Sequence, residues 1–86
     1  MRTTRQVRAV LGSLRAAPEH TSYGYEVITE VNLTSGSVYP ILRRLEAAWW
    51  LQSREDPSPL AGRPSRRSYY WFTDLGLREA AKVPGP

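Results

Sequence analysis

Cysteine is absent from this 86-residue sequence, and histidine occurs only at position 20. Without cysteine, the chain can form neither a disulfide framework nor a thiolate metal site. One histidine is too few for a zinc site or a Ser-His-Asp triad. No pair of carboxylates and no nucleophile–base arrangement stands out, so we expect no enzyme, no cofactor and no metal.

Long hydrophobic runs are missing as well. The longest run, Ala47–Leu51, is far shorter than the roughly 20 apolar residues that span a bilayer. The N-terminal segment lacks the unbroken apolar stretch of a signal peptide. We therefore expect a soluble, cytoplasmic protein of one domain, with no membrane partner.

Lysine is scarce too: it occurs once, at position 82, and the other eleven basic residues are arginine. The formal net charge is +4. A modest positive excess is compatible with nucleic-acid binding but is weak evidence for it. The arginines become informative only if they gather on one surface, which the hydrophobic pattern can test.

Apolar residues recur at helical spacing in three segments, which predicts helices over 3–16, 23–31 and 35–48. Asn32 suits a left-handed turn after the second helix, and only about three residues precede the third, so a helix-turn-helix is expected. The expected N-caps are Thr3 or Thr4, Thr21 or Ser22, and Thr34 or Ser35. The expected inward residues are Val7, Val10, Leu11 and Leu14; Tyr23, Val27, Ile28 and Val31; and Val38, Ile41, Leu42 and Leu45.

The C-terminal half predicts a hairpin and a last helix. Strands are expected over 50–54 and 67–72, joined by the proline- and glycine-rich loop 55–65, and a helix over 74–82 capped by Thr73. Tyr70 and Phe72 would face the core, with Tyr69 and Trp71 on the other side of the strand. Three helices followed by a hairpin and a short helix predict an α+β fold, a single winged helix-turn-helix domain over 1–86, with the hairpin as the wing.

The outer face of the 35–48 helix is unusually bare. Gly36, Pro40, Arg43 and Ala47 lie opposite its apolar stripe. A helix that enters the DNA major groove needs short side chains where it meets bases or backbone. Arg43 could then reach a base edge, where its planar fork suits guanine. This pattern predicts that residues 35–48 read double-stranded DNA.

The flanks of the same helix predict contacts that position the protein without reading sequence. Ser35, Ser37 and the first N–H groups suit a phosphate, because a helix N-terminus favours anions. Arg44 and Tyr39 would also meet phosphates. Two alternatives stay open: Tyr39 is a packing residue at the edge of the stripe, and the paired arginines are solvated charges facing Glu46 or Glu30.

The predicted wing carries the other basic cluster. Arg63, Arg66 and Arg67 lie on or beside the loop, within reach of a minor groove or the DNA backbone. The alternative is a basic loop with no partner. Five of the eleven arginines thus fall on two elements, which is better evidence for DNA binding than the net charge.

Three motifs in this order resemble the DNA-binding domain of the PadR family of transcriptional regulators. They are YGYEVITE (23–30), SGSVYPILRRLE (35–46) and GRPSRRSYYWFTDLG (62–76). Any one motif is weak, but three in register are specific. The resemblance implies a bacterial, nucleoid-associated winged-helix repressor that binds operator DNA as a dimer.

The sequence departs from the family pattern at two tryptophans. Trp49 occupies a position where the family has glycine, and a left-handed conformation there would cost tryptophan roughly 1 kcal/mol, so we expect the helix to end differently. Trp71 occupies a position that is usually polar. Family members also carry a C-terminal helical region for dimerisation, and this sequence ends soon after the helix expected at 74–82.

These aromatic residues suggest a partner surface. Trp50 is expected in the core, whereas Trp49, Tyr69 and Trp71 could form a homodimer contact, as could the terminal helices; alternatively, the tryptophans pack against the 3–16 helix. Two other functions stay open: a winged-helix protein-interaction module without DNA binding, and a phage or plasmid architectural, partition or excision factor.

Overall fold

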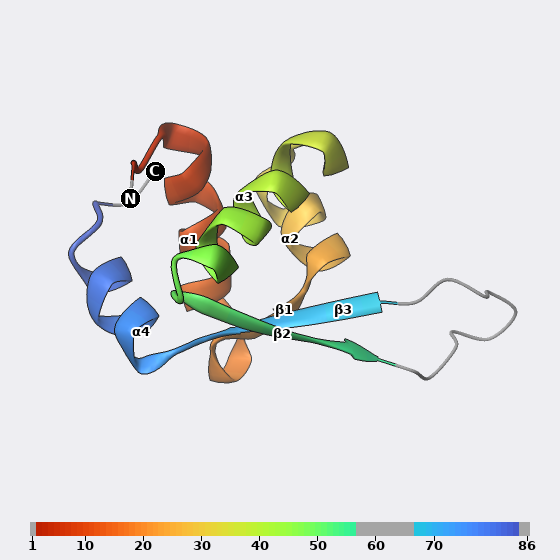
Figure 1. The fold of residues 1–86 in the computed structure, drawn as a ribbon. Coiled ribbons are helices and arrows are strands. Elements are labelled where there is room, and N and C mark those ends of the chain that lie inside the picture. Colours follow the sequence, from red (N-terminus) through yellow and green to blue (C-terminus); the bar gives the residue numbers. More distant parts are fainter. Residues whose placement is uncertain (1, 57–66, 85–86) are drawn as a thin grey trace, which may run out of the picture.

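The computed structural model describes residues 2–56 and 67–84, and it confirms the α+β winged-helix fold (Figure 1). The helices cover one side of a small sheet, and β2 and β3 extend away from them as a hairpin. In chain order the elements are α1 (Arg5–Ala16), the short 3-10 helix η1 (Pro18–His20), β1 (Thr21–Tyr23), α2 (Gly24–Val31), α3 (Ser35–Ala47), β2 (Leu51–Asp56), β3 (Arg67–Phe72) and α4 (Asp74–Ala81).

The sheet has a third strand that the sequence analysis missed. β1 pairs antiparallel with β3, which lies between β1 and β2. Because β1 is a strand, Thr21 and Ser22 are not the N-cap of α2; that expectation was wrong. The N-cap is Tyr23, whose N–H donates to the carboxylate of Glu26 at 3.2 Å. The first strand of the hairpin also differs from expectation: it was expected over 50–54, whereas β2 begins at Leu51 and runs to Asp56.

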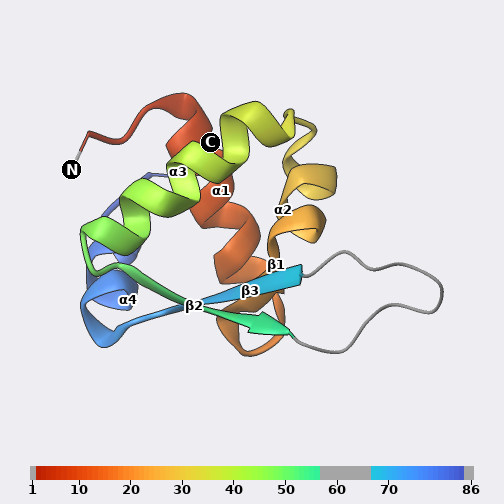
Figure 2. The same cartoon turned by 45° about the vertical axis from the view of Figure 1, so that its right-hand side comes forward.

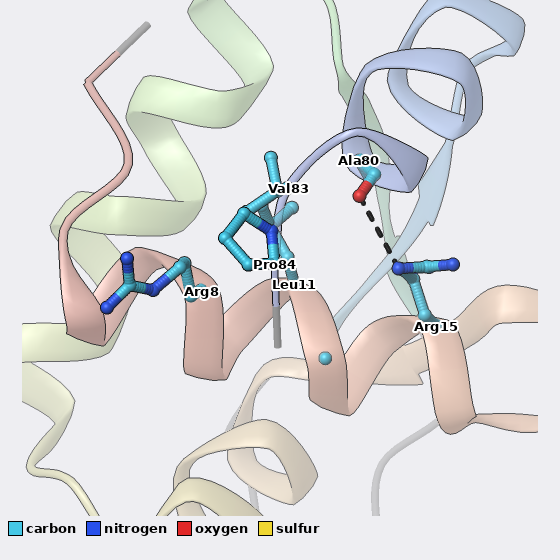
Figure 3. Close-up of a pocket in the computed structure, with 7 residues that line it drawn as sticks. Arg8, Leu11, Arg15, Ala80, Val83 and Pro84 are labelled. Carbon is cyan, nitrogen blue, oxygen red and sulfur yellow. Dashed lines mark hydrogen bonds between the residues drawn. The ribbon is translucent and has the colours of Figure 1, made fainter. Parts of the chain in front are cut away.

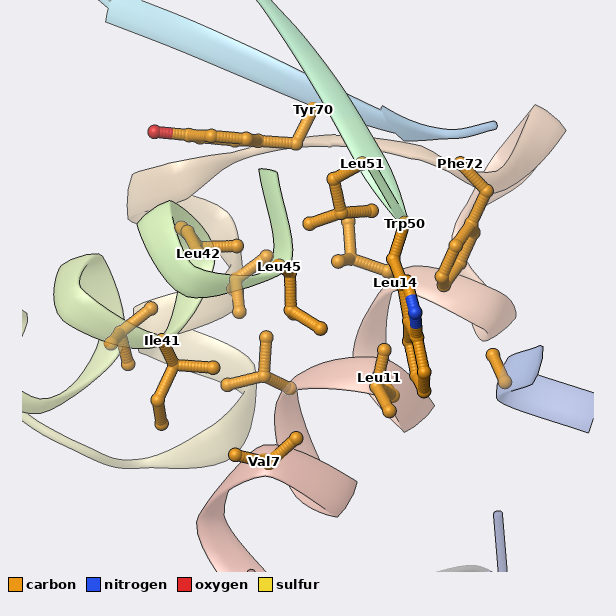
Figure 4. Close-up of a cluster of buried hydrophobic side chains, with 14 residues drawn as sticks. Val7, Leu11, Leu14, Ile41, Leu42, Leu45, Trp50, Leu51, Tyr70 and Phe72 are labelled. Carbon is orange, nitrogen blue, oxygen red and sulfur yellow. The ribbon is translucent and has the colours of Figure 1, made fainter. Parts of the chain in front are cut away.

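The core lies between the helices and the inner face of the sheet. In Figure 4, Trp50 and Phe72 point toward Leu11 and Leu14 of α1. Tyr70 and Phe72 are buried, as the alternation along β3 predicts. Tyr23 is only partly buried and lies outside the core cluster, so its expected place there was wrong. The buried hydrophobic residues are Val7, Val10, Leu11, Leu14, Val27, Val38, Ile41, Leu42, Leu45, Trp50, Leu51, Tyr70, Phe72 and Ala80.

The helix-turn-helix has the expected geometry. Asn32 adopts a left-handed conformation with φ of 56° and ends α2, and α3 begins three residues later at Ser35. A partly buried polar contact ties α2 to α1, since the Ser13 hydroxyl donates to the carboxylate of Glu30 at 2.8 Å. The first helix of the motif is therefore held against α1.

The last helix is fixed to the turn after α3. The Thr73 hydroxyl accepts the N–H of Gly76 at 2.9 Å and so caps α4, as expected. The N–H of Thr73 donates to the carbonyl of Trp50 at 3.0 Å, and its hydroxyl also donates to the carbonyl of Trp49. The end of β3 and the end of α3 are therefore joined through main-chain carbonyls.

Two arginines of α1 belong to the scaffold on this side of the domain. Arg15 donates from Nη1 to the carbonyl of Ala80 at 3.4 Å. Figure 3 shows Val83 and Pro84 between Arg15 and Arg8, over α1. Arg15 thus joins α1 to α4, and Arg8 lies beside the segment that follows α4. None of the described helices is long and apolar enough to cross a membrane.

Candidate nucleic-acid interface

The outer face of α3 is free of other parts of the described chain. Gly36, Pro40, Arg43 and Ala47 are all exposed, while the opposite stripe of Val38, Ile41, Leu42 and Leu45 is at most 2 % exposed. Figure 2 shows α3 along the outside of the helical layer, above the hairpin. The helix thus presents one slim edge with a single long side chain, as its periodicity predicts.

Pro40 shapes this edge without interrupting the helix. A proline has no N–H to donate to the carbonyl four residues earlier, which here belongs to Gly36. Both residues are exposed, so that carbonyl lies on the outer edge of α3 rather than in the core.

Arg43 and Arg44 have no carboxylate partner within residues 2–56 and 67–84. The two acidic groups that could have neutralised them are engaged elsewhere: Glu46 accepts from the Ser53 hydroxyl at 2.7 Å, and Glu30 accepts from Ser13. The expected pairs of Arg43 or Arg44 with Glu46 or Glu30 are therefore not formed, and both arginines are exposed to solvent.

The first turn of α3 offers unpaired donors. The carbonyl of Thr34 accepts the N–H groups of Ser37 and Val38 at 3.1 and 3.0 Å. Among the described residues no group accepts the N–H of Ser35 or Gly36, and the Thr34 hydroxyl turns to Ser37 at 3.2 Å instead of capping the helix. Two N–H groups and the exposed Ser35 hydroxyl therefore lie at the positive end of the helix dipole, beside the Ser37 hydroxyl, which accepts from Thr34.

Tyr39 makes the packing contact that the sequence left as one of two alternatives. It is half-buried against the core cluster. A Cβ at Gly24 would lie 2.8 Å from Cε1 of its ring, so the glycine of α2 leaves the space that this ring fills. Tyr39 therefore helps to set the distance between α2 and α3.

The root of the wing is built around Arg67. Its guanidinium carbon lies 4.9 Å above the ring of Tyr23, and its Nη2 is 3.4 Å from Asp56. The hydroxyl of Tyr25 accepts from its Nη1 at 3.4 Å, and this bond raises the pKa of Arg67, so the group stays charged. The hydroxyl of Tyr23 donates to Asp56 at 2.9 Å, a bond that raises the pKa of Tyr23. The other two arginines expected in the wing, Arg63 and Arg66, lie outside the described residues.

Tyr25 is an exposed aromatic residue beside the root of the wing that the sequence analysis did not single out. Its side chain is 43 % exposed and stacks on Tyr23 with ring centroids 5.4 Å apart. Tyr25 lies off the inward stripe of α2, and this position was the sign in the sequence that its side chain would be exposed. Its place at the start of α2, beside Arg67, depends on the β1–β3 pairing, which was not foreseen.

The three tryptophans have different environments. Trp50 is buried in the core, as expected. Trp49 is 67 % exposed, so it does not pack against α1. Trp71 is partly exposed on the outer face of β3, with its ring 5.6 Å from that of Tyr69.

Comparison with known proteins identifies the fold. The family model of the PadR-like transcriptional regulators matches residues 10–82. A search of curated proteins gave no match. Among solved structures, a PadR family transcriptional regulator from Eggerthella lenta is 33 % identical with a TM-score of 0.71, over 90 % of this chain and 66 % of that one.

Two further structures extend the comparison. The PcaV transcriptional regulator from Streptomyces coelicolor, in complex with its natural ligand, is 28 % identical with a TM-score of 0.76, over 94 % of this chain and 52 % of that one. PadR from Bacillus subtilis, in complex with operator DNA, shares the fold at 20 % identity, with a TM-score of 0.72, over 99 % of this chain and 52 % of its own length. The chain spans about half the length of these two proteins. With the family model covering residues 10–82, it belongs to the PadR-like family of transcriptional regulators.

Proposed function

We propose that this protein is a sequence-specific DNA-binding regulator that acts as a repressor by occupying its operator. The observation that carries the proposal is the exposed edge of α3, where Gly36, Pro40 and Ala47 surround an arginine without a described carboxylate partner. The complex of B. subtilis PadR with operator DNA supports a role in DNA binding at the level of the fold. We place the protein in the cytoplasm of a bacterium, associated with the nucleoid.

Reading of the major groove would rest on α3. A helix with its side chains is about 10–12 Å across, and the groove is about 12 Å wide, so only a helix with a slim edge approaches the bases closely. The exposed small residues of α3 meet this requirement. Arg43 lies between Pro40 and Ala47, where a long side chain could contact the O6 and N7 atoms of a guanine.

Phosphate contacts would fix the helix in the groove. The free N–H groups of Ser35 and Gly36 and the hydroxyl of Ser37 form a cluster of donors at the start of α3, which suits one phosphate. Arg44, exposed on the flank of the helix, suits a second. Such contacts add affinity but carry no sequence information.

The wing would hold the flanking DNA. We propose that Arg63 and Arg66 contact a minor groove or its backbone, as arginines in basic loops commonly do. Arg67 has another role in this proposal. Because it is bound to Asp56, Tyr25 and the ring of Tyr23, it would hold the base of the hairpin and add positive potential, rather than swing freely toward DNA.

The decisive variant is Arg43→Ala. A target site is first selected from a random pool of duplexes, and the affinity of the protein for this site and for a shuffled duplex is then measured. Loss of a bidentate base contact should weaken binding to the selected site by roughly 1–3 kcal/mol, with little change on the shuffled duplex. Arg78→Ala, which removes an exposed arginine of α4, is the matched control. Equal affinities of the Arg43 variant and wild type on both duplexes would show that α3 does not read bases.

The wing makes a different prediction. Arg66→Ala should weaken binding to all sequences alike and lower the slope of log K against log salt by about one unit, because a phosphate contact releases counterions. A change confined to the selected site would contradict this role.

Dimerisation is part of the proposal because family regulators act at paired half-sites. The exposed Trp49, together with Tyr69 and Trp71, offers aromatic surface for a homodimer. Sedimentation of the wild type and of Trp71→Ser tests this contact. A monomer in both cases rejects it, and a palindromic selected site would support two copies on the DNA.

A second candidate function is favoured by the exposed Trp49 alone. A winged helix that docks proteins and does not bind DNA would also present an aromatic side chain to solvent. A gel shift with non-specific duplex at low and moderate salt separates the two functions. A protein-docking module gives no shift at either salt concentration. A DNA-binding domain shifts the duplex at low salt, and the shift disappears as the salt concentration rises.

A further inference from the structure

The outer face of the sheet carries a hollow that has no part in the proposed DNA contacts. We propose that this hollow binds a small organic cation of the alkylammonium class. It lies beside β1 at the start of α2, has a volume of about 280 Å³, and is lined by Thr21, Ser22, Tyr23, Glu26 and Tyr69. The proposal concerns a site on the sheet and does not depend on how α3 contacts DNA.

Two tyrosine rings form the aromatic wall. Tyr23 of β1 pairs directly with Tyr69 of β3 across the sheet, so both side chains leave the same face. Their ring centroids are 5.8 Å apart, and their planes are inclined at 74°. Both rings also line the hollow, so each can offer part of its electron-rich surface to a cation there.

A carboxylate completes the charge complementarity. Glu26 lines the hollow and is exposed, and the structure fixes its Oε1 by the N–H of Tyr23 at 3.2 Å. A negative side chain beside aromatic faces favours a positive ligand and disfavours anions, including the phosphates of nucleic acid. The ligand class is therefore a cation with an apolar surface.

The same aromatic group already holds a cation within the protein. The guanidinium carbon of Arg67 lies 4.9 Å over the ring of Tyr23. This contact is a cation–π interaction, the same kind of interaction that we propose for the ligand. Because Arg67 occupies one face of Tyr23, we expect an added ligand to contact mainly Tyr69 and Glu26.

The walls of the hollow are supported from behind. Tyr25 stacks on Tyr23 at an interplanar angle of 18°, and the ring of Trp71 lies 5.6 Å from that of Tyr69. These contacts restrict both rings before a ligand arrives, which lowers the ordering cost of binding. A loose pair of surface tyrosines would lack this advantage.

The test uses choline as the probe, and it follows the backbone amide signals of the whole chain by two-dimensional NMR. The neutral isostere 3,3-dimethylbutan-1-ol and sodium chloride at equal concentration are the controls for shape and for ionic strength. We expect saturable shifts for residues 21–26 and 69–71 with choline alone. The alcohol should produce no saturable change at these residues.

Two variants locate the binding energy. Glu26→Gln removes the charge but keeps an oxygen that can accept the N–H of Tyr23, because glutamine serves equally at this position of a capping box. It should weaken choline binding about fivefold. Glu79→Gln removes a partly exposed carboxylate of α4, outside the hollow, and should leave binding unchanged. Tyr69→Leu keeps apolar bulk on β3 and should also weaken binding.

Any of three results would overturn the proposal: shifts that do not saturate or that are scattered over the surface, equal binding of the neutral alcohol, or an unchanged affinity in Glu26→Gln. The amide spectrum of each variant reports its folding in the same experiment, so a misfolded variant is recognised directly. None of these results depends on whether α3 binds DNA.

Discussion

Gly76 gives the sharpest test of how α4 is attached, because the structure leaves no room for a side chain there. A Cβ at this position would lie 1.9 Å from the carbonyl oxygen of Trp50 and 2.7 Å from its carbonyl carbon. Both are main-chain atoms, so a rotamer change cannot relieve the contact. We expect Gly76→Ala to push the first turn of α4 away from the turn after α3 by more than an ångström.

The magnitude follows from what this shift would break. The same carbonyl oxygen accepts the N–H of Thr73 at 3.0 Å and the Thr73 hydroxyl at 3.3 Å. Losing two hydrogen bonds costs about 2 kcal/mol, and overpacking costs typically 1–3 kcal/mol. A loss of about 3 kcal/mol is a large part of the roughly 4–13 kcal/mol expected for a domain of this size, and it should lower Tm by roughly 12–24 °C.

The assay is thermal and urea unfolding followed by circular dichroism, with Gly36→Ala as the matched control. At Gly36 a Cβ would meet only the Thr34 hydroxyl at 3.9 Å, so this change should leave stability unchanged or raise it by up to about 1 kcal/mol. If Gly76→Ala melts within about 2 °C of the wild type, the close approach of α4 to the Trp50 carbonyl is not what holds the helix.

Three further predictions concern the stability of the fold. Thr73→Val removes the N-cap of α4 and the hydroxyl bonds to the turn after α3. Urea unfolding should show that the free energy of unfolding falls by about 1–2 kcal/mol. A fall no larger than that of the exposed control Thr29→Val would contradict the role of Thr73 as a cap. Trp49→Gly removes the strain of a left-handed tryptophan that is 67 % exposed. The same assay should show that the free energy of unfolding rises by up to about 1 kcal/mol. A fall would mean that the indole ring makes stabilising contacts. Burial raises the pKa of Tyr70 above its usual 10.0, with the charge of Glu46 adding to the effect. The unfolded chain therefore loses this proton first, so the stabilisation is complete below about pH 10 and declines as the pH rises from there through the folded pKa. Urea midpoints at about pH 8, 10 and 11 should fall with pH in the wild type and fall less in Tyr70→Phe.

Residues whose role depends on their own helix could be predicted from the sequence. The inward positions of α3 are all but fully buried, and Gly36, Pro40 and Arg43 are exposed on its opposite edge. Helical periodicity alone decides which face is apolar, and the apolar face must be covered. The same holds for Thr73, because a hydroxyl directly before a helix is well placed to cap it.

Trp49 shows where a local rule did not decide the outcome. A left-handed tryptophan is unfavourable in isolation, so a different helix end was expected, and this was wrong: Trp49 has φ of 64°. The N–H of Trp50 reaches back to the carbonyl of Leu45 at 2.9 Å, a bond typical of helices closed by a left-handed residue. The Thr73 hydroxyl also binds the carbonyl of Trp49, so a contact distant in sequence holds this conformation.

Arg67 and β1 show the same limit for the site. In the sequence Arg67 is one of three wing arginines, yet the hairpin register sets it opposite Asp56, and the β1–β3 pairing adds the ring of Tyr23. A strand of three residues is too short to produce a pattern of alternation, so it could not be predicted from the residues alone.

The sequence by itself determined the order of the elements, the slim face of α3 and the membership of each apolar stripe, because these depend on spacing along one segment. Only the tertiary structure decided the third strand, the left-handed Trp49, the closed contact at Gly76 and the aromatic group around Arg67. Each of these depends on atoms that lie more than 15 residues apart in the chain or on a strand register, and such distances are fixed only when the whole core is packed.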